Sequence, residues 1–460
     1  MELQAFISKL IEQKRDKIIE LSDKIWESPE IHFQEFKSSE YLCTSLEEEG
    51  FQVERDVAGL KTGFIGSFGN GKPVIAILGE FDALTGLSQK KGVVKHDPIV
   101  EGGHGHGCGH NLLGAGSFAA AVAVKDYIQQ KGLQGTVRYY GCPAEESGGG
   151  KVIMARAGLF EDADIALSWH PSTTPGIWNI SSLANYCVTY RYKGISAHAA
   201  AAPHLGRSAL DAVELMNVGV NYLREHIIPE ARVHYAVTNT GGTSPNVVQP
   251  YAEVVYFIRA PKKSQAKEIV ERVNDIAKGA ALMTGTTMEY TIEGSVSNLV
   301  SNDTLANVMY ENLTALEVPT YDEFDYQFAK EIRATLTPEE LKAALVDVDK
   351  ETAKKLIDKD IADEIPLLGP EITLSGSTDV GDVSWFVPTM QCVTACWALG
   401  TPLHTWQVVS QGGMPIAHKG MLHAGKIIAS TAIQIMENPE IIEKAKAEWK
   451  ERLDGEQYIY

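Results

Sequence analysis

The sequence predicts an α/β fold in which a large domain with a mostly parallel β-sheet is interrupted by a smaller α+β domain. Two observations support this prediction. Short apolar runs alternate with helical segments over residues 74–169, a β-α-β rhythm typical of parallel sheets covered by helices on both faces. Over residues 184–296 the order changes to β-α-β-β-α-β, which is typical of a split βαβ unit with an antiparallel sheet.

The composition limits the possible functions. The 460 residues are 44% hydrophobic and 22% charged, as in a folded protein of two or three domains. The formal net charge of −19 argues against binding to nucleic acid or to an anionic membrane, because both need a basic face. No apolar segment resembles a signal peptide or is long enough to span a bilayer. We therefore expect a cytoplasmic protein with six free thiols.

The first elements lead to an acidic pair. Two amphipathic helices and three strand-like runs are predicted at residues 3–27, 35–49, 52–55, 62–66 and 74–79. The last run is almost wholly apolar, as in a strand buried on both faces, and it ends at Glu80 and Asp82. Acidic groups at the carboxyl end of such a strand lie where open α/β sheets place active sites. Taken alone, Asp82 is equally well interpreted as a cap of the next turn.

A glycine-rich stretch at residues 103–111 carries typical metal ligands. His104, His106, Cys108 and His110 alternate with glycine, so imidazoles and a thiol lie on a backbone that can fold tightly around an ion. A phosphate-binding loop is a competing interpretation, but no lysine follows the glycines and a phosphate site has no use for alternating imidazoles. A surface histidine tract that binds metal adventitiously is the other alternative.

Further ligand candidates follow predicted strands. They are Glu145 and Glu146 after strand 136–140, His170 after strand 163–169, and His404 after strand 391–398. Adjacent glutamates are usually solvated surface charges, but these two follow a buried strand and precede three glycines. The carboxyl ends of parallel strands share one edge of the sheet, so these side chains are predicted to lie together.

Other histidines and cysteines are interpreted structurally. His418 and His423 lie on a predicted late helix, where packing or surface roles are expected rather than ligation. Cys392 and Cys396 lie in an apolar strand and are predicted to be buried thiols. Residues 320–363 are highly charged and predicted to form a surface helical insertion, in which Thr337 caps a helix that begins at Pro338.

The smaller domain has its own pattern of elements. Its strands are predicted at 186–192, 232–238, 252–259 and 286–293, and its helices at 208–226 and 264–283. A sheet of this kind has an edge strand that is free to pair with the same strand of a second copy, which would give a twofold dimer.

The ligand candidates exceed the needs of one ion. The candidates are Asp82, Cys108, His110, Glu145, Glu146, His170 and His404. They are too many for one tetrahedral zinc and fit two divalent ions that share a ligand. A spare glutamate beside such a pair can take a proton from water. This combination indicates metal-assisted amide hydrolysis. The mixture of thiol, imidazole and carboxylate suits zinc by softness, and manganese is also compatible.

Several motifs together resemble a known family. The motifs are Gly-Cys-Gly-His-Asn at 107–111, Pro-Ala-Glu-Glu at 143–146, Trp-His at 169–170, residues 194–200 and the late His404. Together they resemble the motifs of the dinuclear metallopeptidases and amidohydrolases that include aminoacylase, carboxypeptidase G and the auxin-conjugate hydrolases. The resemblance covers nearly the whole chain. It implies a phosphorylase/hydrolase-like catalytic domain at 1–183 and 297–460, a ferredoxin-like lid and dimerisation domain at 184–296, and a homodimer.

The resemblance also assigns roles to the residues of the catalytic domain. Cys108 matches the ligand that bridges both metals. Glu146 and His404 match the further ligands of one metal, and His110 and His170 match those of the other. Glu145 matches the general base, and Asp82 the carboxylate that orients a ligand imidazole.

In the lid domain, the resemblance points to substrate contacts. His198 matches a residue that points at the substrate carbonyl, commonly across a dimer interface. Asn246 and Arg259 fall on positions that contact the carboxylate end of the substrate. One departure concerns Glu80, which stands where many relatives have a metal-binding histidine, so that metal occupancy or identity is expected to differ.

The function implied is hydrolysis of the amide bond of an N-acyl or N-aroyl amino acid, similar to p-aminobenzoyl-glutamate, or of a small dipeptide. The resemblance implies that a metal-bridged water, activated by Glu145, attacks the carbonyl. The alternative is a metal-binding interaction protein that keeps the fold without turnover. The presence of Glu145 favours the enzyme, because a purely structural metal site needs no further carboxylate beside it.

Overall fold

The computed structural model describes residues 2–147 and 149–460, and they divide into two compact units. Unit 1 contains residues 2–147, 149–180, 300–372 and 383–457, and unit 2 contains residues 181–299, 373–382 and 458–460. Unit 2 therefore includes two short segments, 373–382 and 458–460, that lie outside the predicted lid domain at 184–296. Each unit has its own hydrophobic core.

Unit 1 is built on a seven-stranded sheet in the order β1-β2-β4-β3-β5-β13-β6. Its strands are β1 (Gln52–Arg55), β2 (Phe64–Asn70), β3 (Val74–Glu80), β4 (Gly135–Cys142), β5 (Ile165–Ser172), β6 (Gly176–Ile177) and β13 (Thr389–Ala395). The four central strands, β4, β3, β5 and β13, are parallel. The outer strands pair antiparallel. The predicted α/β fold with a largely parallel central sheet is confirmed.

The helices of unit 1 cover this sheet. They are α1 (Glu2–Glu12), α2 (Arg15–Trp26), α3 (Phe36–Glu48), α4 (His110–Lys131), α5 (Gly150–Arg156), α8 (Asp303–Leu316), α9 (Glu323–Arg333), α10 (Pro338–Ala343), α11 (Lys350–Leu356), α13 (Trp406–Gln411), α14 (Pro415–Glu437) and α15 (Pro439–Leu453). The helix predicted at 3–27 is in fact two helices that are separated at residues 13–14. The predicted insertion at 320–363 is helical, and Thr337 caps α10 as expected.

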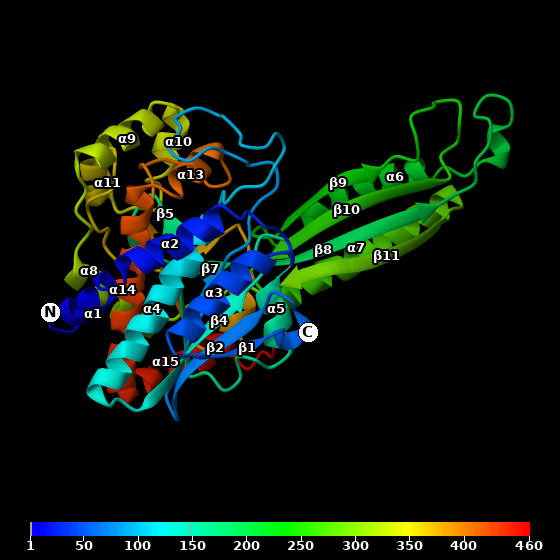
Figure 1. The fold of residues 1–460 in the computed structure, drawn as a ribbon. Helices are drawn as coiled ribbons and strands as arrows, with labels where there is room; N and C mark the ends of the chain where they lie inside the picture. Colours follow the sequence, from blue (N-terminus) through cyan, green and yellow to red (C-terminus); the bar gives the residue numbers. More distant parts are fainter. Residues whose placement is uncertain (1, 148) are drawn as a thin grey trace. The chain divides into compact units, whose positions relative to one another are not determined.

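Small residues bring α4 close to the sheet and to α14, beside which it packs (Figure 1). A Cβ atom at Gly116 would lie 2.6 Å from the Trp169 ring on β5, and one at Gly114 would lie 2.8 Å from the Glu80 carbonyl oxygen at the end of β3. Only glycine permits this approach. The first turn of α4 is therefore held against the carboxyl ends of β3 and β5.

Unit 2 is an antiparallel four-stranded sheet in the order β11-β8-β10-β9 with two helices on one face. Its elements are β8 (Ala184–Lys193), α6 (Ala209–Leu223), β9 (Arg232–Asn239), β10 (Tyr251–Ala260), α7 (Lys263–Thr284) and β11 (Thr287–Val296). Alternate side chains of β10, including Val254, Tyr256 and Ile258, are buried against the helices. The split βαβ pattern read from the sequence is present.

The short elements β7 (Ile180–Ser182) and β12 (Ile372–Leu374) pair as a separate two-stranded sheet. The polar, glycine-bearing segment 375–385 contains a short helix, α12 (Val380–Ser384). Within residues 2–147 and 149–460, no helix combines the length and the hydropathy that crossing a membrane requires.

Candidate metal centre and active site

Three parallel strands deliver the candidate side chains to one edge of the sheet of unit 1. Asp82 follows β3, Glu145 and Glu146 follow β4, and His170 lies near the end of β5. From the sequence, His170 is predicted to follow its strand. β5 in fact runs to Ser172, so His170 belongs to the strand itself. Its imidazole is still at the carboxyl end, where the glycine-rich turn before α4 also arrives.

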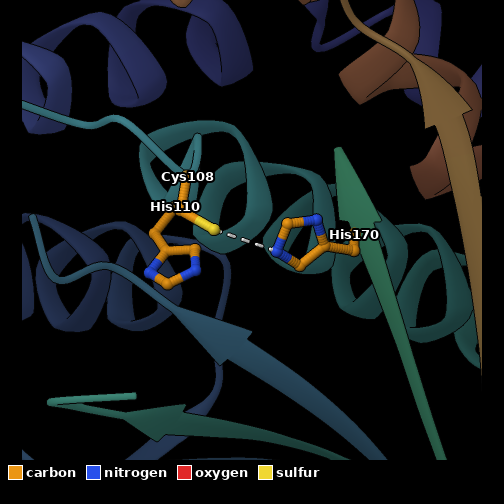
Figure 2. Close-up of side chains that lie close together, drawn as sticks. All are labelled: Cys108, His110 and His170. Atoms are coloured by element: carbon orange, nitrogen blue, oxygen red, sulfur yellow. Dashed lines mark hydrogen bonds between the residues drawn. The ribbon is translucent and has the colours of Figure 1, made fainter. Parts of the chain in front are cut away.

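Cys108, His110 and His170 point toward one another (Figure 2). The Cys108 Sγ atom lies 3.3 Å from His170 Nε2. Two ligands that bind one ion at about 2.0–2.3 Å are about 3–4 Å apart, so this separation fits a shared ion. Cys108 and His110 come from the start of α4, and His170 comes from β5.

A second group shares the same thiol. Cys108, Glu146 and His404 have ligand atoms within 4.8 Å of one another, and His404 Nε2 lies 3.5 Å from Glu146 Oε2. The two groups are those that the family resemblance assigned to the two metals. A thiol between two sets of imidazole and carboxylate ligands has the chemistry of a bridging ligand, so the residues fit a pair of divalent ions.

Asp82 connects the two groups. Its Oδ1 atom lies 2.8 Å from His110 Nδ1, and its Oδ2 atom accepts a hydrogen bond of 2.9 Å from the backbone N–H of Glu146. Because Nδ1 faces a carboxylate, Nε2 is the His110 nitrogen available to an ion. That Nε2 atom is buried and forms no hydrogen bond of good geometry, and its nearest carboxylate oxygen is that of Glu80, at 3.3 Å.

Burial and neighbouring charges shift the proton affinities of this cluster. Burial raises the pKa of the Cys108 thiol, so binding of an ion there must displace a proton. Burial and the nearby His110 lower the pKa of His170 to about 4, which leaves its imidazole neutral at pH 7. Burial alone would raise the pKa of Asp82, but the adjacent His110 and the Glu146 amide hold it below its usual value.

Sequence reasoning missed a buried ion pair beside the site. Lys151 on α5 is fully buried, and its Nζ atom lies 2.7 Å from Glu80 Oε1. The other oxygen of Glu80 lies 3.3 Å from His110 Nε2. Glu80, His110 and Glu145 form a third group of potential ligands. A lysine after three glycines gave no signal of burial, because the pattern is equally typical of a surface turn.

The comparisons with known proteins agree with this geometry. The model of peptidase family M20/M25/M40 matches residues 76–402. The chain is 48% identical to the B subunit of p-aminobenzoyl-glutamate hydrolase from Escherichia coli, over 99% of this chain and 97% of that protein. The chain belongs to peptidase family M20/M25/M40.

Two further comparisons are consistent with this assignment. The Xaa-Arg dipeptidase of Mus musculus is 29% identical over 98% of this chain and 92% of that protein. The Bacillus subtilis YXEP protein, described as a dinuclear metal-binding peptidase of the M20 family, has the same fold with a TM-score of 0.56, 19% identity and coverage of 94% of this chain and 99% of that one.

These comparisons confirm two predictions. The sequence predicts a similarity to the B subunit of p-aminobenzoyl-glutamate hydrolase from residues 79–84, 375–384 and 403–407. The comparison with the E. coli protein confirms this similarity. The M20 chain is a hydrolase, which favours the predicted enzyme over the alternative of an interaction protein without turnover.

The other histidines of the glycine-rich stretch and the two on the late helix lie elsewhere. His106 is buried, and its Nε2 atom lies 3.0 Å from the Ile25 carbonyl oxygen. His418 Nε2 lies 3.0 Å from Asp23 Oδ1. Among the described residues, neither these histidines nor His104 and His423 belong to a group that could hold a metal. Of the three histidines in the glycine-rich stretch, only His110 reaches the centre.

The three candidate substrate residues of unit 2 do not lie together. The backbone N–H of Ala199 donates to the Asn246 carbonyl, and His198 forms a bridge with Val247, so His198 and Asn246 are neighbours. Arg259 lies near the opposite end of β10, which starts at Tyr251. At about 3.3 Å per residue, eight strand residues span roughly 26 Å. One small substrate cannot contact all three in one chain.

His198 is exposed and has a defined tautomer. Its Nδ1 atom accepts hydrogen bonds of 3.2 Å from the backbone N–H groups of Ala200 and Ala201. Since Nδ1 is the acceptor, the neutral ring carries its proton on Nε2. His198 therefore presents an exposed N–H donor.

Arg259 lines a cavity of about 580 Å³ within unit 2. Arg224, Arg232 and His234 also line it, and Ile227, Ile228 and Val233 give it an apolar wall. Arg259 donates to the Ser377 hydroxyl over 2.8 Å, while Arg224 and Arg232 donate to backbone carbonyls. Among the described residues, no carboxylate pairs with these three arginines.

Proposed function

We propose that this chain hydrolyses the amide bond of an N-acyl or N-aroyl amino acid, with an acidic amino acid such as glutamate as its preferred leaving group. The observation that carries the proposal is the pair of ligand groups, Cys108 with His110 and His170, and Cys108 with Glu146 and His404, beside the further carboxylate of Glu145. The E. coli relative is named for p-aminobenzoyl-glutamate, which is therefore the first substrate to test.

Glu145 is the proposed general base. Two divalent ions bound by these ligands would make water more acidic and polarise the substrate carbonyl. The Glu145 carboxylate takes a proton from the attacking water and returns it to the leaving nitrogen. Asp82 keeps the His110 ring and the Glu146 backbone in place, and the exposed Nε2–H of His198 donates to the carbonyl oxygen.

Unit 2 would select the amino-acid part of the substrate. Arginines bind carboxylates well because the planar guanidinium offers parallel N–H donors. The cavity holds two further arginines beside Arg259, so this cavity favours an anion of more than one charge. In a protein with a net charge of −19, three arginines without carboxylate partners among the described residues support a site for a dicarboxylate.

We further propose that the protein works as a homodimer through unit 2. Because His198 and Asn246 are separated from Arg259 along β10, a second copy would supply the first two residues to each site. β9 is an edge strand of the sheet, and α6 exposes Leu215, Val218 and Tyr222, an apolar stripe suited to isologous pairing. Relatives are named as A and B subunits of one E. coli enzyme, so a second subunit type is the competing partner.

The identity of the ions and the location of the protein complete the proposal. The ligands suit zinc or manganese, since they combine a thiol with imidazoles and carboxylates. We propose a cytoplasmic protein, because free thiols and an acidic composition are typical of that compartment.

The test combines metal analysis with a substrate comparison. The purified protein should contain two divalent ions per chain by elemental analysis and should hydrolyse p-aminobenzoyl-glutamate faster than p-aminobenzoyl-leucine. Glu145→Gln should retain both ions and lose activity by about a hundredfold to ten-thousandfold. Near-normal turnover by this variant with full metal occupancy would reject Glu145 as the base. Equal rates on both substrates would reject the acidic specificity.

A further inference from the structure

The turn between α2 and α3, residues 28–35, contains a buried carboxylate that the sequence did not single out. Glu35 is 0% exposed. Its Oε1 atom accepts hydrogen bonds from the backbone N–H groups of Phe33, over 2.9 Å, and of Ala144, over 3.2 Å. Its Oε2 atom accepts from the Thr62 hydroxyl over 2.9 Å. Both oxygens are therefore occupied by donors, and one donor belongs to the loop after β4.

That loop has an unusual backbone at the residue before Glu145. Ala144 has φ of 56°, in the left-handed region that non-glycine residues rarely adopt. The Ala144 carbonyl accepts a hydrogen bond of 2.8 Å from Gly149 N–H, so the loop is closed on itself. Such a conformation persists only where its surroundings enforce it.

Two carboxylates hold the backbone on either side of Glu145. Glu35 accepts from the N–H of Ala144, and Asp82 accepts from the N–H of Glu146. His32, in the same turn as Glu35, lies 2.8 Å from the Ser147 hydroxyl through its Nδ1 atom. The turn is itself tied to the end of β3, because Ala83 N–H donates to the Glu30 carbonyl over 2.8 Å.

We propose that Glu35 is a positioning residue that holds Ala144 in its left-handed conformation and thereby aims the Glu145 carboxylate. The proposal rests on the proposed role of Glu145 as general base. Burial and the nearby Asp82 raise the pKa of Glu35, although its hydrogen bonds to the backbone and to Thr62 oppose this shift. A merely space-filling residue would be apolar there, since a buried carboxylate is costly unless its hydrogen bonds serve the fold or the site.

The first test replaces Glu35. In Glu35→Ala the Ala144 amide loses its acceptor, the loop relaxes, and kcat should fall by roughly tenfold to a hundredfold, the scale of a misplacement of about 1 Å. KM and metal content should change little, because no ligand and no substrate contact is removed. Glu35→Gln keeps an oxygen that can accept from Ala144 and should retain most of the rate.

The second test relieves the backbone. Glycine adopts a positive φ without strain, so Ala144→Gly in the Glu35→Ala background should restore kcat several-fold. Asp164→Asn is the matched control: Asp164 is also a buried carboxylate that accepts from a backbone amide, that of Val74 over 2.8 Å, but at the opposite end of β3. It should lower thermal stability without lowering kcat.

The outcomes separate this inference from the proposed function. If Glu145→Gln loses activity while Glu35→Ala keeps its kcat, the positioning role is wrong and the general base stands. If Glu35→Ala loses bound metal, or if Ala144→Gly restores nothing, Glu35 acts only on the fold and the inference is overturned. If Glu145→Gln retains activity, the proposed base fails, whatever the Glu35 variants show.

Discussion

At the scale of single residues, the site depends on side chains that each serve two partners. Cys108 belongs to both ligand groups, and Asp82 contacts both a ligand imidazole and the backbone of a ligand glutamate. Shared residues couple the groups, so the loss of one atom affects both. This coupling distinguishes a paired site from two independent ions.

Replacement of Cys108 tests that coupling. In Cys108→Ala, each group keeps only two of its three ligands, and we expect the content of both metals to fall together. The measurement is elemental analysis after dialysis, with Cys392→Ala as the control, because Cys392 is an equally buried thiol on β13 that belongs to no ligand group of the described residues. Two ions retained by Cys108→Ala would contradict the bridging role.

The residues that sequence analysis found and missed differ in their chemical surroundings. Cys108, His110 and His170 were found because such ligands rarely gather at strand ends by chance. Glu35 and Lys151 were missed because a charged residue in a turn between helices, or after three glycines, is usually exposed. Their burial depends on partners that are distant in the sequence, Ala144 for Glu35 and Glu80 for Lys151, and no local pattern contains that information.

At the scale of elements, periodicity predicted helices and strands better than it predicted their breaks and partners. The helix predicted at 3–27 is interrupted at residues 13–14, where Lys14 pairs with Glu49 and Asp126 of other segments. The antiparallel pairing of β2 with β4 depends on contacts between residues far apart in the chain, whereas the apolar core of β3 was visible from its composition alone.

Gly116 provides a prediction about the packing of α4. An alanine Cβ there would meet the Trp169 ring at 2.6 Å, and overpacking typically costs about 1–3 kcal/mol. Gly116→Ala should therefore lower the free energy of unfolding despite the higher helix propensity of alanine. Gly279→Ala on α7 is the control, since its Cβ would meet nothing within 4 Å, and it should stabilise by up to about 1 kcal/mol. Chemical denaturation of both variants measures the difference.

Glu49, at the end of α3, provides a prediction about pH. Burial would raise its pKa, but Lys14, Lys17 and Lys125 lower it to about 2. A carboxylate whose pKa is lower in the folded state than its usual 4.5 stabilises the fold at higher pH, and this contribution is lost as the pH falls from about 4.5 toward 2. In Glu49→Gln the thermal midpoint should therefore fall less steeply below pH 5 than in the parent protein.

The neighbouring Glu48 is the matched control for this pH dependence. Its side chain is 59% exposed and pairs with Lys17, and exposed ion pairs contribute little to stability. Glu48→Gln should reproduce the pH profile of the parent. Identical profiles for Glu49→Gln and the parent protein would show that the lysine cluster does not hold α2, α3 and α4 together.

At the scale of the whole molecule, we expect activity to depend on a dimer, because Arg259 is separated from His198 along β10. If a second copy supplies His198, each site combines Glu145 of one chain with His198 of the other. The variants His198→Ala and Glu145→Gln should both be nearly inactive alone. In a hybrid of the two, the site with an intact Glu145 also receives an intact His198, while the other site lacks both.

Mixing the two variants under conditions that exchange subunits should therefore restore activity. With random pairing, half of the dimers are hybrids and one of their two sites works, so the recovered rate should approach about a quarter of that of the parent protein. The control is the same mixture without subunit exchange, which should remain inactive. Hybrids that are demonstrated by mass and still inactive would show that His198 acts in its own chain, because each hybrid site then lacks either His198 or Glu145.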